Sequence, residues 1–328
     1  MPSDIPPWLD ELLACPVDAS ALESQDTAYR CPACRRSYGA RDGIVVLLPD
    51  HLKHLGAGAD RAARPARMEP ATEWVSDEMA WWDDYVKTDS QEPLRADAGI
   101  RGRARERNLF RHVREAVGPE PTVLELGAGS SRTVAGLWSP DAYGIRYVAT
   151  DLSAPWLRSG APLRGGGAAV QCDAVAWPFR DGVADVVLVL GVLHHLPDWR
   201  GALSRAFASL RPGGRLLLHE VIYKPRIFAG RRPSGVTDGW TSPHEGSVGE
   251  NELRAHLDEH GAVQRWRREG TPLRFGAAHY GDLHVRLEQS PRLTTALELA
   301  DQAFGRTLGR IRPSLGFNEI LCVCRKPG

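Results

Sequence analysis

Acidic and glycine residues follow three consecutive predicted strands, and their types could hold one nucleoside-like ligand. Glu125, Gly127 and Gly129 form Glu-Leu-Gly-Ala-Gly, Asp151 ends the next apolar run, and Asp173 follows the run after that. Glycines remove the side chains that would keep a bulky ligand away from a strand end. A carboxylate beside such a turn can accept hydrogen bonds from both ribose hydroxyls, and one on the next strand can accept from an adenine amine.

A dinucleotide fits this turn less well. Its fingerprint needs a third glycine three residues after the second, but the chain has Arg132 there. The pyrophosphate of a dinucleotide binds at the helix N-terminus that this glycine opens. The turn therefore favours another ligand.

A second group of chemistry-bearing residues lies near the N-terminus. Cys31 and Cys34 form a Cys-x-x-Cys knuckle, and an earlier segment has Cys15 and Asp18 at the same spacing. Such a set can bind one tetrahedral zinc ion, with a carboxylate in place of the fourth thiolate. Four protein ligands leave no open position, so bound zinc would be structural. The alternative is a degraded site that folds without metal.

Short apolar runs alternate with helical patterns after residue 73, which predicts a parallel sheet with crossover helices. The expected strands are 122–126, 147–150, 168–171, 185–190, 215–219, 263–267 and 319–324. The expected helices are 73–86, 101–117, 131–137, 154–159, 199–210 and 250–260. We expect a cysteine-containing module over 1–50, a linker over 51–72 that is rich in Ala, Gly, Pro and Arg, and a catalytic domain over 73–328. Segments 222–249 and 270–318 exceed a minimal fold, and are expected to shape a substrate pocket with His244, His279 and Tyr280.

These motifs resemble class I S-adenosylmethionine-dependent methyltransferases in order and spacing, strongly over about residues 120–225. Besides the glycine turn and the two aspartates, the resemblance includes Leu-His-His-Leu at 193–196 and Leu-Arg-Pro-Gly-Gly at 210–214. It implies an α/β fold: a Rossmann-like seven-stranded sheet with helices on both faces. It also implies S-adenosylmethionine as cofactor. The implied cofactor-binding residues are Glu125, Gly127, Ala128, Gly129, Asp151, Leu152, Cys172, Asp173, Ala174 and Gly191.

Methyl transfer to an oxygen or nitrogen that carries a proton also needs a base, and histidine suits this near neutral pH. His194 follows the fourth strand of the predicted domain, and in similar small-molecule methyltransferases a histidine in this Leu-His setting acts as the base. Alternatively, His194 and His195 only shape the pocket. Glu220, at the end of the fifth strand, is a second candidate.

The N-terminal segment resembles the small zinc-ribbon-like activator subunits of RNA and protein methyltransferases, over about residues 8–49. The likeness includes the ending Arg41-Asp42-Gly43-Ile44. It implies a module that stabilises the fold, mediates homodimer contacts or binds a partner. The aromatic and acidic segment 74–85 resembles the lid helix of such enzymes; the alternative is that its tryptophans only cover the sheet.

Composition limits the partners. The 328 residues include 41 Lys and Arg against 41 Asp and Glu, whereas nucleic-acid-binding faces usually bring a basic excess. No apolar run reaches the roughly 18 residues of a membrane span. The N-terminus reads MPSDIPPWLDELL, unlike a signal peptide. We expect a cytoplasmic protein whose six cysteines are thiols or metal ligands.

Three functions remain open. The first is methylation of a small-molecule acceptor at oxygen, nitrogen or carbon, in specialised metabolism. The second is methylation of a ribosomal or transfer RNA base, since a cysteine knuckle ahead of this domain resembles ribosomal guanine methyltransferases and arginines of 101–117 could contact phosphates. The third is a cofactor-binding scaffold, or an enzyme redirected to another reaction.

Overall fold

The computed structural model describes residues 5–25, 28–56, 69–88, 120–129, 144–160, 166–222, 248–270, 290–311, 317 and 319–328. The helices expected at 101–117 and 131–137 lie outside these residues. So do His244, His279 and Tyr280.

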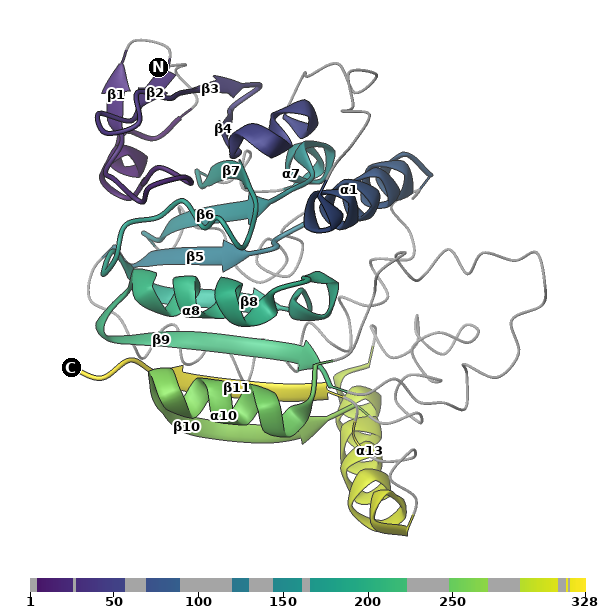
Figure 1. Ribbon diagram of the computed structural model, residues 1–328. Coiled ribbons are helices and arrows are strands. Elements are labelled where there is room, and N and C mark those ends of the chain that lie inside the picture. The colour runs from purple at the N-terminus through teal and green to yellow at the C-terminus, as the bar shows by residue number, and fades with distance from the viewer. Residues whose placement is uncertain are drawn as a thin grey trace.

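The described strands form one mixed sheet in the order β1-β2-β3-β4-β7-β6-β5-β8-β9-β11-β10 (Figure 1). The strands are β1 (Glu23–Gln25), β2 (Ala28–Arg30), β3 (Ser37–Arg41), β4 (Ile44–Leu47), β5 (Thr122–Leu126), β6 (Arg146–Asp151), β7 (Ala168–Cys172), β8 (Ala184–Leu190), β9 (Leu210–Val221), β10 (Ala262–Glu269) and β11 (Glu319–Arg325). The central strands from β4 to β9 pair in parallel. Antiparallel pairs close both edges of the sheet.

Apolar side chains on both faces explain the central strands. Every residue of β5 and β7 is buried, as expected for parallel strands covered on both sides. Successive strand residues point to opposite faces, so Val123 packs in one core cluster and Leu124 in another. The second of these clusters also contains residues of the N-terminal module and of two helices, α8 and α10.

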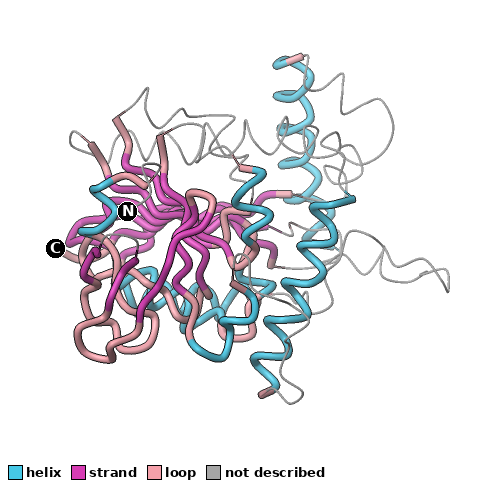
Figure 2. Tube along the Cα trace, turned by 90° about the horizontal axis from the view of Figure 1, so that it is seen from above, coloured by secondary structure: helices cyan, strands magenta, loops and turns pink. Residues whose placement is uncertain are grey.

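Described helices lie against one face of the sheet and beyond one end of its strands (Figures 1 and 2). The α-helices are α1 (Pro70–Thr88), α7 (Ala154–Ser159), α8 (Trp199–Ser209), α10 (Glu250–His260) and α13 (Pro291–Ile311), and the 3-10 helices are η1 (Pro7–Glu11), η2 (Asp50–Leu55) and η7 (Leu193–His195). Helices α8 and α10 pack together on one face, whereas Ala154 and Leu157 of α7 belong to the core of the other. No described helix is long and apolar enough to cross a membrane.

The N-terminal module extends the main sheet, whereas a seven-stranded sheet with a separate module was expected. Strand β4 pairs in parallel with β7, from Ile44 opposite Ala169 to Leu47 opposite Cys172. The described sheet therefore has eleven strands. The pairing joins segments more than 120 residues apart, a relation that apolar patterning cannot reveal.

Two further expectations need correction. The start of the linker expected over 51–72 is helical, because η2 buries Leu52 and Leu55 against Met79 of α1. Strand β9 begins at Leu210, so the Arg-Pro-Gly-Gly segment lies inside it, where the register with β8 shifts. Gly213 adopts φ +77° there, a conformation that glycine tolerates.

Candidate active site

The candidate site lies where the strand order reverses, with β5 between β6 and β8. Crevices beyond the carboxyl ends of parallel strands at such a point commonly hold ligands in α/β sheets. Gly127 after β5 faces Val192 after β8, and a Cβ added to Gly127 would lie 2.8 Å from the Cβ of Val192. Gly127 also has φ +64°. Close contact between the two loops thus requires glycine at this position.

Asp151, at the carboxyl end of β6, links the glycine turn to α7. Its Oδ2 accepts a hydrogen bond from the Gly129 amide at 2.8 Å, and its Oδ1 accepts from the Ser153 amide at 2.8 Å. Burial raises the pKa of Asp151 to about 6, although these two amides act to lower it. Gly129 has φ +54°, and no described atom lies within 4 Å of the position of an added Cβ. A partly buried carboxylate therefore lies at a strand end and holds the amide of the glycine turn.

Glu125 and Asp173 lie at the ends of the strands on either side of β6. Glu125 is buried and accepts a hydrogen bond from the Tyr147 hydroxyl. Asp173 follows β7 and accepts from the Val175 amide at 3.0 Å. Burial raises the pKa of Asp173, and this amide partly opposes the rise. The three carboxylates thus end three neighbouring strands, as the sequence predicts.

His194 forms a pair with Glu220. Its Nδ1 lies 2.5 Å from Oε1 of Glu220, whose side chain is fully buried. The other carboxylate oxygen accepts hydrogen bonds from the amides of Val192 and Leu193 at 3.1 and 2.7 Å. Burial opposes the ionisation of Glu220, but the charge and hydrogen bond of His194 outweigh it and lower the pKa of Glu220. Glu220 thus lies on the buried side of His194 and contacts its Nδ1.

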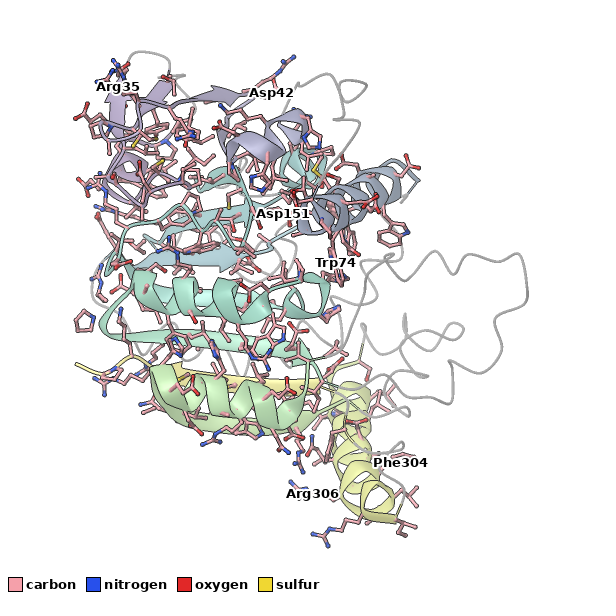
Figure 3. All side chains as sticks on the ribbon, in the orientation of Figure 1. Arg35, Asp42, Trp74, Asp151, Phe304 and Arg306 are labelled. Atoms are coloured by element: carbon pink, nitrogen blue, oxygen red, sulfur yellow. The ribbon has the colours of Figure 1, made fainter. Side chains whose placement is uncertain are left out.

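Helix α1 crosses this end of the sheet and contacts both halves of the site. The Trp74 indole donates to the His195 carbonyl at 3.3 Å, and Glu78 lies 3.5 Å from the His195 ring nitrogen Nδ1. Further along the helix, buried Asp83 accepts a hydrogen bond from Ser153. Trp74 and Asp151 lie at the same end of the sheet (Figure 3).

Ser153 and Asp83 lie at the site, but the sequence did not predict either residue or the contact between them. Ser153 is the N-cap of α7, where its hydroxyl accepts from the Trp156 amide at 3.3 Å. A serine directly before a helix is a recognisable cap signal. Its bond to Asp83 links segments 70 residues apart, which local spacing cannot reveal.

The other predicted cofactor residues surround the same strand ends. The Ala128 amide donates to the Thr150 carbonyl at 2.7 Å, and the Gly191 amide donates to the His219 carbonyl at 2.7 Å. Leu152 packs beside η2 and α1, and Ala174 is partly buried. Cys172 is buried, and burial raises its pKa well above the usual value for a thiol.

The four predicted metal ligands converge in the N-terminal module. The sulfurs of Cys15 and Cys34 lie 3.6 Å apart, and the Cys31 sulfur lies 3.3 and 3.4 Å from the two carboxylate oxygens of Asp18. One ligand atom from each residue lies within 4.8 Å of the others. Tetrahedral zinc with bonds of about 2.3 Å separates sulfur ligands by about 3.8 Å. The four side chains therefore fit a zinc ion.

Residues 124–218 match the family described as "Methyltransferase domain". The matched segment runs from β5 to β9. The chain is 37% identical over 112 residues to a demethylmenaquinone methyltransferase of Mycolicibacterium gilvum. The aligned residues make up 34% of this chain and 47% of that protein. The chain is 30% identical over 166 residues to a 27-O-demethylrifamycin SV methyltransferase of Amycolatopsis mediterranei, covering 47% of the chain and 57% of that protein. The matches thus span about half the length of these curated relatives.

A solved structure has a similar fold over most of this chain. Geranyl diphosphate C-methyltransferase from Streptomyces coelicolor A3(2), in complex with S-adenosyl-L-homocysteine, superposes with a TM-score of 0.52 and 15% sequence identity. The superposition covers 79% of this chain and all of that one. The expected α/β methyltransferase fold is thereby confirmed.

Proposed function

We propose that this protein transfers a methyl group from S-adenosylmethionine to a small-molecule acceptor. The observation that carries the proposal is the position of Asp151. It ends β6, which lies between β5 and β7, and it binds the amide of Gly129 in the glycine turn. The matched domain supports the reaction class. The relatives named for demethylmenaquinone and 27-O-demethylrifamycin SV support a small acceptor.

The cofactor-binding residues that we propose are those at the strand ends. Asp151 would accept hydrogen bonds from the ribose hydroxyls, and Asp173 would accept one from the adenine amine. Glu125 would bind the amino group of the methionine part, and the glycine turn would admit the ligand to the strand ends. When bound, S-adenosylmethionine would supply the electrophilic methyl group.

On the acceptor side, we propose that His194 removes a proton from the acceptor. Glu220 faces Nδ1, and a carboxylate that holds the Nδ1 proton leaves the basic lone pair on Nε2. Glu220 is fully buried and acts through His194, as a positioning residue. His195 and helix α1 would line the acceptor side of the pocket and help to exclude water.

Calorimetry with S-adenosylmethionine and S-adenosylhomocysteine tests the cofactor assignment. We expect saturable binding to the wild type and at least tenfold weaker binding to Asp151→Asn, because the amide loses the charge that strengthens bonds from hydroxyls. Asp181→Asn, at an exposed turn, is the matched control and should bind like the wild type. No heat with the wild type would rule out the proposal.

Two alternatives are distinguished by the acceptor. Transfer of labelled methyl groups to quinones or polyketides supports a small-molecule enzyme, whereas transfer to ribosomal RNA would replace it with a base methyltransferase. Tight cofactor binding without transfer to any acceptor would support a scaffold or a redirected enzyme.

We further propose that Cys15, Asp18, Cys31 and Cys34 bind one structural zinc ion. Amides support the thiolates, since the Cys34 amide donates to the Cys31 sulfur at 3.4 Å and the Val17 amide donates to the Cys15 sulfur at 3.5 Å. Metal analysis of the purified chain should find zinc that Cys31→Ser loses. A metal-free wild type that is fully folded would contradict this proposal.

A further inference from the structure

Helix α10 carries a second group of metal-ligating side chains, remote from the candidate active site and the cysteine cluster. His256 and His260 are four residues apart, which places them on the same helical face. Their ring centroids are 4.5 Å apart. One ligand atom from each of His256, Glu259 and His260 lies within 4.8 Å of the others. Two imidazoles and a carboxylate suit zinc and similar borderline ions.

The hydrogen bonds around the two rings suit metal binding. Nδ1 of His260 lies 2.9 Å from the His256 carbonyl; a carbonyl only accepts, so Nδ1 carries the proton and Nε2 carries the lone pair. Nε2 of His256 lies 3.2 Å from the Ser204 hydroxyl on α8, and its Nδ1 lies 3.9 Å from Glu259. Ligating histidines usually donate their second N–H to an oxygen in this way.

Charge and accessibility also suit a cation. The Glu259 side chain is 70% exposed and the His256 side chain 11% exposed, so an ion can enter from solvent beside a partly buried ring. The positive charge of Arg200 on α8 is offset by Glu252, with which it pairs at 2.5 Å.

The position of this group excludes a part in methyl transfer. Helix α10 ends at His260, just before β10 begins opposite Arg325. Arg325 in turn lies opposite Arg215, far from the carboxyl end of β9. The rings of Trp199 and Phe207 flank the two histidines from α8. An ion here would brace α10 and, through Ser204, its contact with α8.

We propose that His256, Glu259 and His260 form a binding site for a divalent transition-metal ion such as Zn²⁺. The site is distinct from the cysteine cluster, and three protein ligands leave a coordination position for water.

Cobalt(II) titration of the metal-free full-length chain, without a polyhistidine tag, tests the proposal. Cobalt at the cysteine cluster gives a thiolate charge-transfer band, whereas cobalt bound by imidazole and carboxylate does not. We expect one equivalent without this band, and we expect the double variant His256→Gln/His260→Gln to lose it. The matched control His51→Gln, at an exposed histidine, should retain it.

Two milder variants keep the test decisive if the double variant fails to fold. Glu259→Gln removes a ligand from an exposed side chain, and Ser204→Ala removes only the oxygen beside His256. We expect each to weaken this equivalent by about tenfold or more. The proposal is overturned if the wild type lacks an equivalent free of the thiolate band. It is equally overturned if the folded double variant or Glu259→Gln binds cobalt like the wild type.

Discussion

At the residue scale, the raised pKa of Asp151 makes cofactor binding depend on pH. Burial favours the protonated acid, with a pKa of about 6 in the ligand-free chain. Ribose hydroxyls that donate to this group favour its ionised form. Below pH 6 the free carboxyl group carries a proton, so cofactor binding must release that proton. We expect the Kd for S-adenosylhomocysteine to rise about tenfold per pH unit below that value. Calorimetry between pH 5 and 8 measures the slope, which Asp151→Asn should lose; an unchanged slope in that variant would assign the dependence to another group.

The pair of His194 and Glu220 gives a second prediction at this scale. His194→Ala should lower kcat by about 10²–10⁴-fold, the usual contribution of a general base. The Kd for S-adenosylhomocysteine should stay unchanged, because in the proposed function the ring contacts the acceptor and not the cofactor. His195→Ala should have a smaller effect on kcat, since the His195 ring contacts Glu78 and Trp82 of α1 and packs beside the His194 ring without the buried carboxylate that His194 has. Equal losses of kcat in the two variants would indicate that both residues only shape the pocket.

At the element scale, strands with a continuous apolar run were predictable and distant pairings were not. The run Val-Val-Leu-Val-Leu in β8 is buried on both faces, and its predicted bounds differ from the structure by one residue. Arg-Pro-Gly-Gly predicted a turn before the strand, but β9 already begins at Leu210. Leu210 pairs with Ala184 of β8, and the pairing resumes at Arg215 after an irregularity. Which strand β4 would join depends on residues far along the chain. The sequence predicted Glu220 as a second candidate for the base, but only the fold reveals that it faces His194.

The junction between the N-terminal module and the methyltransferase domain depends on Arg180. Its Nε donates to the Leu13 carbonyl at 3.0 Å, and its Nη2 donates to the carbonyls of Asp10 and Leu22 at 3.3 and 3.4 Å. Arg180→Ala should lower the free energy of unfolding by about 3 kcal/mol, because partly buried carbonyls lose charged donors.

Urea unfolding measures this loss. Arg205→Ala, at an exposed position of α8, is the matched control and should change the free energy by less than about 0.5 kcal/mol. Arg180→Lys should fall between the two, since an ammonium group cannot reproduce the guanidinium fork. Equal values for Arg180→Ala and Arg205→Ala would mean that the side chain of Arg180 does not stabilise the junction.

At the scale of the whole molecule, the module and the catalytic domain share a sheet and a core. Val45 and Leu47 of β4 belong to the same buried cluster as Val170 of β7 and Leu203 of α8. Cutting between β4 and β7 would expose apolar side chains on both sides and break the hydrogen bonds of the parallel pair. The module is therefore expected to unfold together with the domain, unlike a tethered accessory unit.

Native-state hydrogen exchange separates these two cases. We expect the amides of β4 to exchange with the same opening free energy as those of β7 and β6, because one cooperative unit has one opening free energy. Arg180→Ala should lower all three values together, since the junction stabilises the whole unit. Exchange of β4 at a much lower free energy than β7 would show that the module opens by itself, and that its pairing with β7 contributes little to the stability of the catalytic domain.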